Sequence, residues 1–168
     1  SAASDVYKRQ HAETTMAILR RHGGHALTAV DFCADAVESV KRRKGTLPVT
    51  VIQADLLELD LDQQFDLVYS SMVVEHFWGD ARRRAIAQHA RFTKPGGHVF
   101  ISVPGRSLFS RIFDFSLNRP AGIREEHFTP GELRSLLTNH GLEIVRFREL
   151  LFGSVLFALA RKERTFSL

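Results

Sequence analysis

Residues 26–55, with the sequence ALTAVDFCADAVESVKRRKGTLPVTVIQAD, decide the fold of this chain. The stretch begins and ends with short apolar runs at 26–31 and 49–53, and runs of this kind predict buried strands. Between them, Cys33, Val37 and Val40 recur at helical spacing, and the helix is expected to end at Lys44-Gly45, because glycine accepts the backbone conformation that follows a helix. A strand–helix–strand unit predicts two parallel strands joined by a helix.

The same alternation continues along the chain. Apolar runs at 65–70 and 99–103 predict two more strands. Helices are expected over 12–22, before Gly23-Gly24, and in a segment that closes at Pro95-Gly96-Gly97 and whose apolar positions are Ala81, Ala85, Ile86 and Ala90. The sequence therefore predicts an α/β fold, a doubly wound three-layer sandwich with a mostly parallel sheet.

A helix start and a hairpin are predicted near the C-terminus. In Thr129-Pro130-Gly131-Glu132, the threonine is expected to cap a helix while the glutamate reaches back to its amide. The buried stripe of this helix would be Leu133, Leu136 and Leu137, and Gly141 would end it. Runs at 142–150 and 154–160, joined through Phe152-Gly153, predict a terminal antiparallel hairpin on the parallel sheet.

Composition and charge exclude several classes of protein. The chain has 168 residues, 44% hydrophobic and 25% charged, which is typical of one globular domain. No apolar run is long enough for a membrane span, and Cys33, the only cysteine, leaves no internal disulfide, so a cytoplasmic location is expected. The net charge of +4 arises from short basic clusters without interleaved aromatic residues, so we expect solvated helix faces and ends rather than a nucleic-acid surface. The sequence leaves the oligomeric state open.

The first ten residues, SAASDVYKRQ, break the alternation of strands and helices. Val6 is their only large aliphatic residue, yet a doubly wound fold needs a strand and a turn before the helix at 12–22. We expect residues 1–10 to be a non-native or disordered leader, residues 11–161 an incomplete domain without its first strand, and residues 162–168 a tail. A genuine disordered N-terminus is the alternative for residues 1–10.

Four places in the chain carry a resemblance to a known family. They are Thr28-Ala29-Val30-Asp31-Phe32, Gln53-Ala54-Asp55-Leu56, the run FDLVYSSMVVEH at 65–76, and Lys94-Pro95-Gly96-Gly97 before an apolar strand. Over residues 11–161 the chain resembles the class I S-adenosylmethionine-dependent methyltransferases that act on small molecules. The resemblance implies S-adenosyl-L-methionine as the cofactor.

The same resemblance implies a role for seven residues in binding that cofactor. Asp31, at the end of the second strand of the family's fold, would accept hydrogen bonds from both ribose hydroxyls, although an acid that favours a helix start is the alternative. Asp55 would accept from the adenine amino group and the Leu56 amide would face a ring nitrogen, unless Asp55 only forms a turn. Phe32 would pack on adenine or belong to the core. The small residues before the pocket, Ser70 and Ser71, with Met72, would let the methionine part approach the backbone.

Two histidines are candidates for the catalytic base. His76 ends the run at 65–76 and is expected on the lip of the pocket, and His127 lies in a segment that could fold over a substrate. Either could accept the proton that an acceptor loses, although positioning and exclusion of water can drive methyl transfer without a base. No metal site is expected, since Glu58, Asp60 and Asp62 look like a solvated acidic loop.

The family's glycine-rich turn before the first helix is missing from residues 1–11. We therefore expect weak S-adenosylmethionine binding or none, and unpaired edges on the strands at 26–31 and 65–70. Calorimetric binding with micromolar affinity would contradict this expectation. Residues 105–126 mix aromatic and basic side chains, and Phe109, Ile112 and Phe113 fit one helical face, so this segment is expected to be a lid or insertion, with core as the alternative.

The predicted function is methyl transfer to a small-molecule or lipid-like acceptor through oxygen, nitrogen or carbon. The aromatic segment favours an apolar acceptor, and four arginines could accommodate an acidic group on it: Arg106, Arg111, Arg119 and Arg124. Two alternatives stay open. One is an oxidoreductase with a nicotinamide-binding Rossmann domain, and the other is a degenerate methyltransferase-like domain that binds a partner without catalysis.

Overall fold

The computed structural model describes residues 16–17, 20–21, 26–107 and 126–164. The chain divides into two compact units, Ser1–Asp60 and Leu61–Leu168. The predicted leader at 1–10, the aromatic residues of the predicted lid and most of the predicted tail lie outside the described residues. No helix among the described residues is long and apolar enough to cross a membrane.

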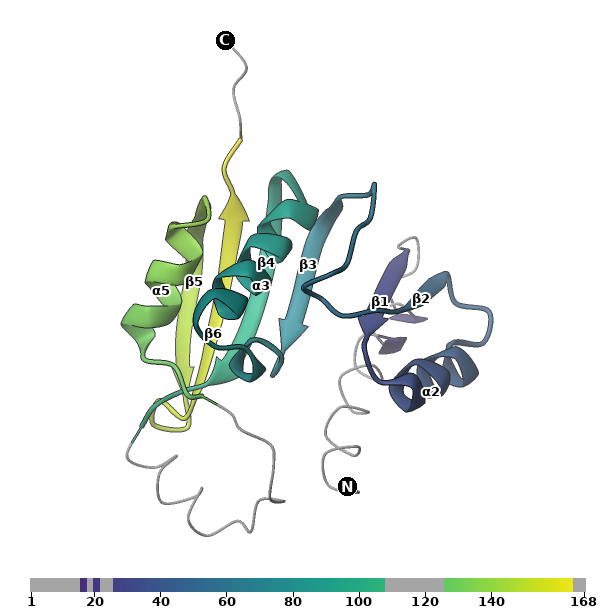
Figure 1. Cartoon of the computed structure of the whole chain (residues 1–168), viewed down its shortest axis with the longest axis horizontal. Helices are drawn as coiled ribbons and strands as arrows, with labels where there is room; N and C mark the ends of the chain where they lie inside the picture. Colours follow the sequence, from purple (N-terminus) through teal and green to yellow (C-terminus); the bar gives the residue numbers. More distant parts are fainter. Residues whose placement is uncertain (1–15, 18–19, 22–25, 108–125, 165–168) are drawn as a thin grey trace, which may run out of the picture. The chain divides into compact units, whose positions relative to one another are not determined.

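The first unit contains the predicted strand–helix–strand arrangement. Strand β1 (Leu27–Asp31) is followed by helix α2 (Ala34–Lys44) and strand β2 (Val49–Gln53), as Figure 1 shows in blue and purple. The two strands pair in parallel, with Leu27 opposite Val49 and Asp31 opposite Gln53. Helix α2 ends at Gly45, whose φ of 55° is easily reached only by glycine. The described residues of the predicted helix at 12–22 are helical.

The second unit has a four-stranded mixed sheet in the order β3-β4-β6-β5. Its elements are strand β3 (Phe65–Ser71), the 3-10 turn η1 (Val74–His76), helix α3 (Gly79–Phe92), strand β4 (Thr93–Pro104), helix α5 (Pro130–Thr138), strand β5 (Leu142–Leu150) and strand β6 (Val155–Lys162). Strands β3 and β4 are parallel, and β6 runs antiparallel to both β4 and β5. The predicted terminal hairpin is therefore confirmed.

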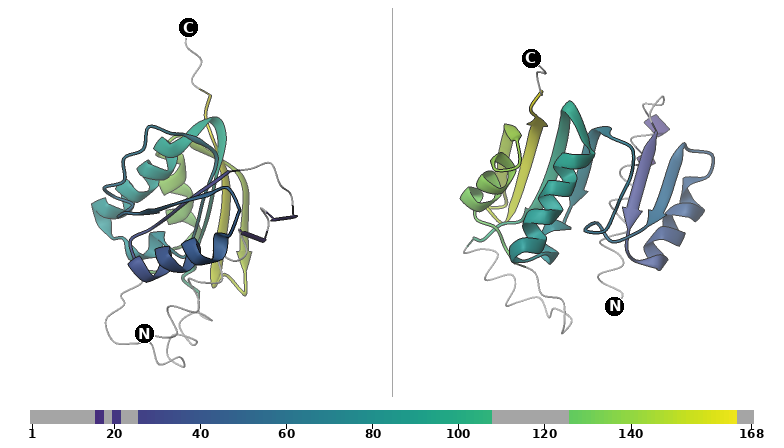
Figure 2. Two further views of the ribbon diagram at one scale, coloured as in Figure 1. Left: turned by 90° about the vertical axis from the view of Figure 1, so that its right-hand side faces the viewer. Right: turned by 45° about the horizontal axis from the view of Figure 1, so that its top comes forward.

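The core of the second unit lies between this sheet and the two helices. Figures 1 and 2 show α3 and α5 on one face of the sheet. On that face, alternate strand residues such as Val99, Ile101 and Leu156 pack with Leu133 and Leu137 of α5, and all five are fully buried. On the opposite face, aromatic rings form a row across three strands, with Tyr69 stacked on Phe100 and Phe100 beside Phe157.

The start of α5 has the predicted capping box. The Glu132 amide donates to Thr129 Oγ1 at 3.2 Å, and the Thr129 amide donates to Glu132 Oε2 at 2.6 Å. Two of the amides that a helix start leaves without helical partners are thereby satisfied. The predicted buried residues Leu133 and Leu137 point into the core, and Leu136 packs at its margin.

Two predicted boundaries were wrong. Helix α3 ends at Phe92, not at Pro95-Gly96-Gly97, because Thr93 already pairs with Phe65 and the chain then bulges before His98 pairs with Leu67. The bulge is held by Lys94, whose Nζ lies 2.9 Å from Asp66 Oδ2. The turn between β5 and β6 also includes Leu151, which adopts a φ of 51°, and β6 begins only at Val155.

Strands β1 and β3 each have only one paired neighbour among the described strands. Strand β1 pairs with β2 alone, and β3 pairs with β4 alone, among the strands of the described residues. That a further strand belongs to the fold stays a prediction.

Candidate functional site

Asp31 and Asp55 leave the first unit's sheet at the same edge. Asp31 ends β1 opposite Gln53, the last residue of β2, and Asp55 follows two residues later. The Ala54 amide donates to the Asp31 carbonyl oxygen at 3.1 Å, so the backbone after β2 stays beside the end of β1. Ligands of parallel α/β sheets bind outside the carboxyl ends of the strands, which is where both acids lie.

Each of these carboxylates is oriented by an amide two residues further on. Cys33 N–H donates to Asp31 Oδ1 at 2.9 Å, and Leu57 N–H donates to Asp55 Oδ1 at 2.9 Å. The turn-forming role that the sequence left open for Asp55 is therefore present. The Leu57 amide uses one acceptor position of the Asp55 carboxylate, which has about four, so turn formation and ligand binding are compatible.

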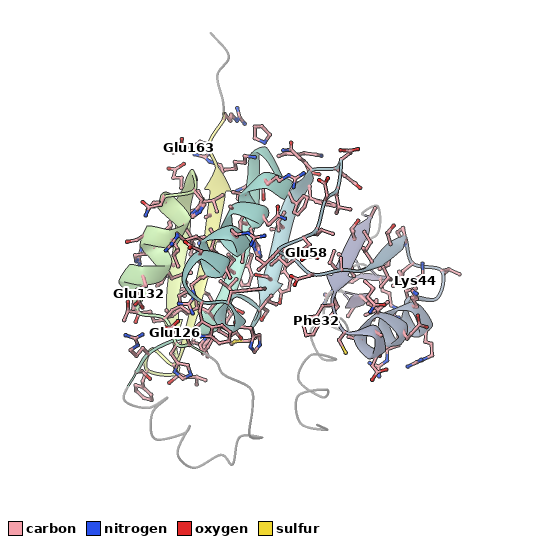
Figure 3. The ribbon with its side chains drawn as sticks, in the orientation of Figure 1. Phe32, Lys44, Glu58, Glu126, Glu132 and Glu163 are labelled. Atoms are coloured by element: carbon pink, nitrogen blue, oxygen red, sulfur yellow. The ribbon has the colours of Figure 1, made fainter. Side chains whose placement is uncertain are left out.

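Phe32 and Leu56 adjoin the two acids. The Phe32 side chain is 68% exposed, which makes it an unusual core residue and leaves its ring surface accessible. Figure 3 shows it beside the start of α2. Its role against adenine stays a prediction.

Ser70, Ser71 and Met72 lie where β3 ends in the second unit. Ser71 Oγ and Ser102 Oγ are 2.6 Å apart, and the Met72 amide donates to the Ser102 carbonyl oxygen at 2.9 Å. Met72 has a φ of 53°, a conformation that costs a non-glycine residue energy. A strained residue directly after a parallel strand is a feature found at many binding sites.

The two candidate bases lie at the carboxyl ends of β3 and β4. His76 belongs to η1, which follows β3, and its Nε2 lies 4.0 Å from Oε1 of the buried Glu75. The segment 126–128, which contains His127, is bound to both neighbouring elements. The Glu126 amide donates to the Glu75 carbonyl oxygen at 3.2 Å, and the Phe128 amide donates to the Pro104 carbonyl oxygen at 2.9 Å.

An imidazole beside a carboxylate can hold a proton during a reaction, because the negative charge stabilises the protonated ring. His76 and Glu75 form such a pair. His127 has a different environment, since its carbonyl oxygen accepts from Arg106 Nη2 at 3.3 Å. Which of the two histidines accepts a proton stays a prediction.

Residues 12–101 match the model of a family described as methyltransferase domain. The chain belongs to the methyltransferase domain family. The resemblance that the sequence suggested is therefore confirmed, and the matched range includes Asp31, Asp55, the three residues at the end of β3, and His76. His127 lies beyond it.

Curated relatives of this methyltransferase domain include a Mycobacterium tuberculosis protein named as a probable S-adenosylmethionine-dependent methyltransferase. It is 36% identical over 126 residues, which are 74% of this chain and 43% of the relative. A malonyl-[acyl-carrier protein] O-methyltransferase of Anoxybacillus flavithermus is 31% identical over 86 residues, covering 51% of this chain and 32% of that protein. The chain thus spans less than half the length of these relatives.

A solved structure supports the fold assignment. The magnesium protoporphyrin IX methyltransferase of Synechocystis, crystallised with S-adenosylhomocysteine, superposes with a TM-score of 0.68 at 15% identity, covering 92% of this chain and 83% of that one. This similarity confirms the α/β methyltransferase fold.

One residue of the methyltransferase domain was interpreted wrongly from the sequence. Arg82 belongs to one of the short basic clusters that were expected on solvated helix faces and ends, but only 9% of it is exposed. Its Nε donates to the Phe77 carbonyl oxygen at 2.9 Å, its Nη2 lies 2.9 Å from Glu126 Oε2, and its guanidinium stacks on the Phe128 ring at 4.1 Å. Arg82 therefore joins the start of α3 to the segment that carries His127.

The sequence contained a signal for this burial. Arg82 precedes the buried residues Ala85, Ile86 and His89 at helical spacing, so it belongs to the apolar stripe of α3. His89 also lies in this stripe. Its Nδ1 is 2.7 Å from the Ala85 carbonyl oxygen, and burial lowers the pKa of the imidazole, as expected for a structural histidine.

An open hollow of about 430 Å³ lies between α3 and α5, with Arg82, Glu126 and Glu132 in its wall. Figure 3 shows Glu126 and Glu132 at the same end of the second unit. None of the predicted cofactor or catalytic residues lines this hollow. Its opposite charges are already paired, because Arg82 binds Glu126 and Arg106 lies 3.9 Å from Glu132.

Proposed function

We propose that this methyltransferase domain transfers a methyl group from S-adenosyl-L-methionine to a small-molecule or lipid-like acceptor. The observation that carries the proposal is the position of Asp31 and Asp55, two oriented carboxylates at the carboxyl ends of adjacent parallel strands. Membership of the family supports the class of reaction. The name of the Mycobacterium tuberculosis relative supports the methyl donor.

In this proposal the first unit holds the nucleoside. Asp31 accepts hydrogen bonds from the two ribose hydroxyls, and hydrogen bonds to a charged acceptor are among the stronger ones in proteins. Asp55 accepts from the adenine amino group, and the Leu56 amide donates to a ring nitrogen. Phe32 provides an exposed ring for contact with the base. The donor and acceptor types of these residues fit a nucleoside.

The residues that follow β3 are proposed to contact the methionine part of the cofactor. Ser70, Ser71 and Met72 allow the amino-acid part of the cofactor to approach the backbone at the end of β3. The bound cofactor supplies an electrophilic methyl group attached to a positively charged sulfur. With the cofactor bound, His76 would take the proton from an acceptor hydroxyl as the methyl group passes from sulfur to the acceptor oxygen and S-adenosylhomocysteine leaves, and Glu75 would stabilise the resulting imidazolium.

The acceptor is proposed to present oxygen. Two kinds of relative are named as O-methyltransferases, one acting on malonyl-[acyl-carrier protein] and the other in ubiquinone biosynthesis. Their names span an acidic and a lipid-like acceptor, which agrees with the apolar or acidic acceptor expected from the sequence. A cytoplasmic location remains part of this proposal.

The first test measures binding of S-adenosylhomocysteine by a ligand-observed NMR titration, which detects millimolar affinity. Asp31→Asn keeps the oxygen that accepts from Cys33 but removes the charge, so it should cost about 1–2 kcal/mol of binding, roughly a 5- to 30-fold rise in Kd. Glu38→Gln is the matched control, because Glu38 is an exposed carboxylate of α2 that pairs with Lys41. Equal affinities of the two variants would contradict the proposed role of Asp31.

The second test concerns the reaction. In a methyl-transfer assay with hydroxyl acceptors, His76→Ala should lower the rate by about 100-fold or more if it removes a general base, with cofactor binding unchanged. His98→Ala is the control, since His98 lies in the middle of β4, six residues before the carboxyl end of that strand. A rate unaffected by His76→Ala would show that positioning alone drives the step.

A further inference from the structure

The turn between β5 and β6 exposes three consecutive large apolar side chains. Leu150 is 51% exposed, Leu151 is 65% exposed and Phe152 is 88% exposed. Single exposed apolar residues are ordinary on a protein surface, but a contiguous group marks a place of interaction. We call residues 150–152 the apolar tip.

The backbone of the apolar tip is strained in a way that keeps these side chains outside. Leu151 and Phe152 have φ values of 51° and 54°, and Gly153 continues the left-handed turn at 79°. Asparagine and glycine adopt this conformation far more easily than leucine or phenylalanine. A turn that uses bulky apolar residues where small polar ones fit better points to a function for their side chains.

Two arginines accompany the apolar tip. Arg146 and Arg148 alternate with Leu150 on β5, and their partners on β6 are Leu159 and Phe157, so the three side chains share the face of the sheet that α3 and α5 do not cover. Both arginines are exposed, and neither forms an ion pair with another described residue. The intervening Glu149 points to the other face, because it pairs with the buried Leu156.

We propose that the apolar tip, together with Arg146 and Arg148, docks onto an anionic lipid bilayer. Apolar and aromatic side chains enter the interfacial zone of a bilayer, while arginines remain at the level of the anionic head groups. The charge of the surface complements such lipids, and the net charge of +4 for the whole chain acts in the same direction. A short hairpin with two basic residues gives weak and reversible binding that depends on ionic strength.

The hairpin also lies beside the end of β4. The Gly105 amide donates to the Ser154 carbonyl oxygen at 2.8 Å, and Ser107 Oγ lies 2.9 Å from Ser154 Oγ. Docking would therefore bring the carboxyl edge of β3 and β4 close to the bilayer. This consequence matters for a lipid-like acceptor only if the proposed function is correct, but lipid binding itself is independent of methyl transfer.

Co-sedimentation of the full chain with vesicles tests the proposal. The chain should bind vesicles of phosphatidylcholine and phosphatidylglycerol, and bind pure phosphatidylcholine vesicles much more weakly. Replacing Arg146 or Arg148 by glutamine should weaken binding by about fivefold for each arginine. The double variant Leu151→Asn/Phe152→Gly should weaken it by at least about tenfold, without loss of folding, because both new residues suit the left-handed turn.

Two control variants address the position of the surface. Leu67→Ser removes an apolar side chain of similar exposure, 55%, from the start of β3 at the opposite edge of the sheet. Arg42→Gln removes a basic side chain from the last turn of α2 in the first unit. Both should bind vesicles as the unchanged chain does.

Three results would overturn the proposal. If the chain does not bind anionic vesicles, a lipid bilayer is excluded as the partner of the apolar tip. Binding that the double variant retains would place the contact elsewhere. A change of oligomeric state in the double variant, measured by sedimentation velocity without vesicles, would identify the apolar tip as an interface between copies of the chain.

Discussion

The double variant Leu151→Asn/Phe152→Gly should make the second unit more stable. Leu151 and Phe152 adopt φ values of 51° and 54°, and the left-handed conformation costs a non-glycine residue about 1–2 kcal/mol. Removing this backbone strain at both positions should therefore stabilise the folded state by about 2–4 kcal/mol. Glycine at 152 lowers the stability by about 1 kcal/mol, because it increases the entropy of the unfolded chain. Little packing is lost, since both side chains are mostly exposed.

The net expectation is a gain of about 1–3 kcal/mol in the free energy of unfolding. Urea denaturation followed by circular dichroism measures the total, and hydrogen exchange of the amides in the β5–β6 ladder assigns it to the second unit. Leu150→Asn is the matched control. Leu150 is 51% exposed and is not among the residues with positive φ, so its replacement should be neutral or destabilising. Equal or lower stability of the double variant would refute the assignment of strain to this turn.

Two further predictions concern the segment around His127. Arg82→Met should destabilise the second unit by about 1–3 kcal/mol, because Arg82 is buried between the Phe77 carbonyl oxygen and Glu126. The control Arg83→Met removes an exposed pair with Asp80 and should change thermal stability by less than about 0.5 kcal/mol. Similar effects of the two variants would contradict the buried role of Arg82. The amide of Thr129 lowers the pKa of Glu132 below its ordinary value of 4.5, so the folded protein binds fewer protons than the unfolded chain, and the stabilisation present above pH 4.5 should disappear as the pH falls through the lowered pKa. Denaturation curves between pH 3 and pH 7 should show that Glu132→Gln loses less free energy of unfolding on acidification than the unchanged chain does. An equal loss in both would mean that other groups cause the pH dependence.

The parts of the fold that could be predicted are those that local sequence encodes. The strand–helix–strand unit at 26–53 and the capping box at Thr129 follow from periodicity and from side chains that bond to nearby backbone. The bulge after Thr93 could not be predicted, because it depends on pairing with β3, nearly thirty residues earlier in the chain. A helix end and a strand bulge both accept glycine, so the sequence PGG alone does not separate them.

The candidate site shows the same division. The positions of Asp31 and Asp55 followed from the ends of two predicted parallel strands, and the structure places both acids at one edge. The burial of Arg82 was missed because the sequence gives charge, while burial depends on Glu126 and Phe128, which approach it only in the folded chain. Periodicity along α3 was the signal that could have indicated it.

The central claim is that Asp31 and Asp55 together hold the nucleoside of the methyl donor. The amides of Cys33 and Leu57 report on these carboxylates directly, since each donates to one of them. In a titration of the nitrogen-15-labelled chain with S-adenosylhomocysteine, both amide signals should shift saturably at millimolar ligand. Saturable shifts elsewhere in the spectrum, with the Cys33 and Leu57 amides unmoved, would contradict the claim.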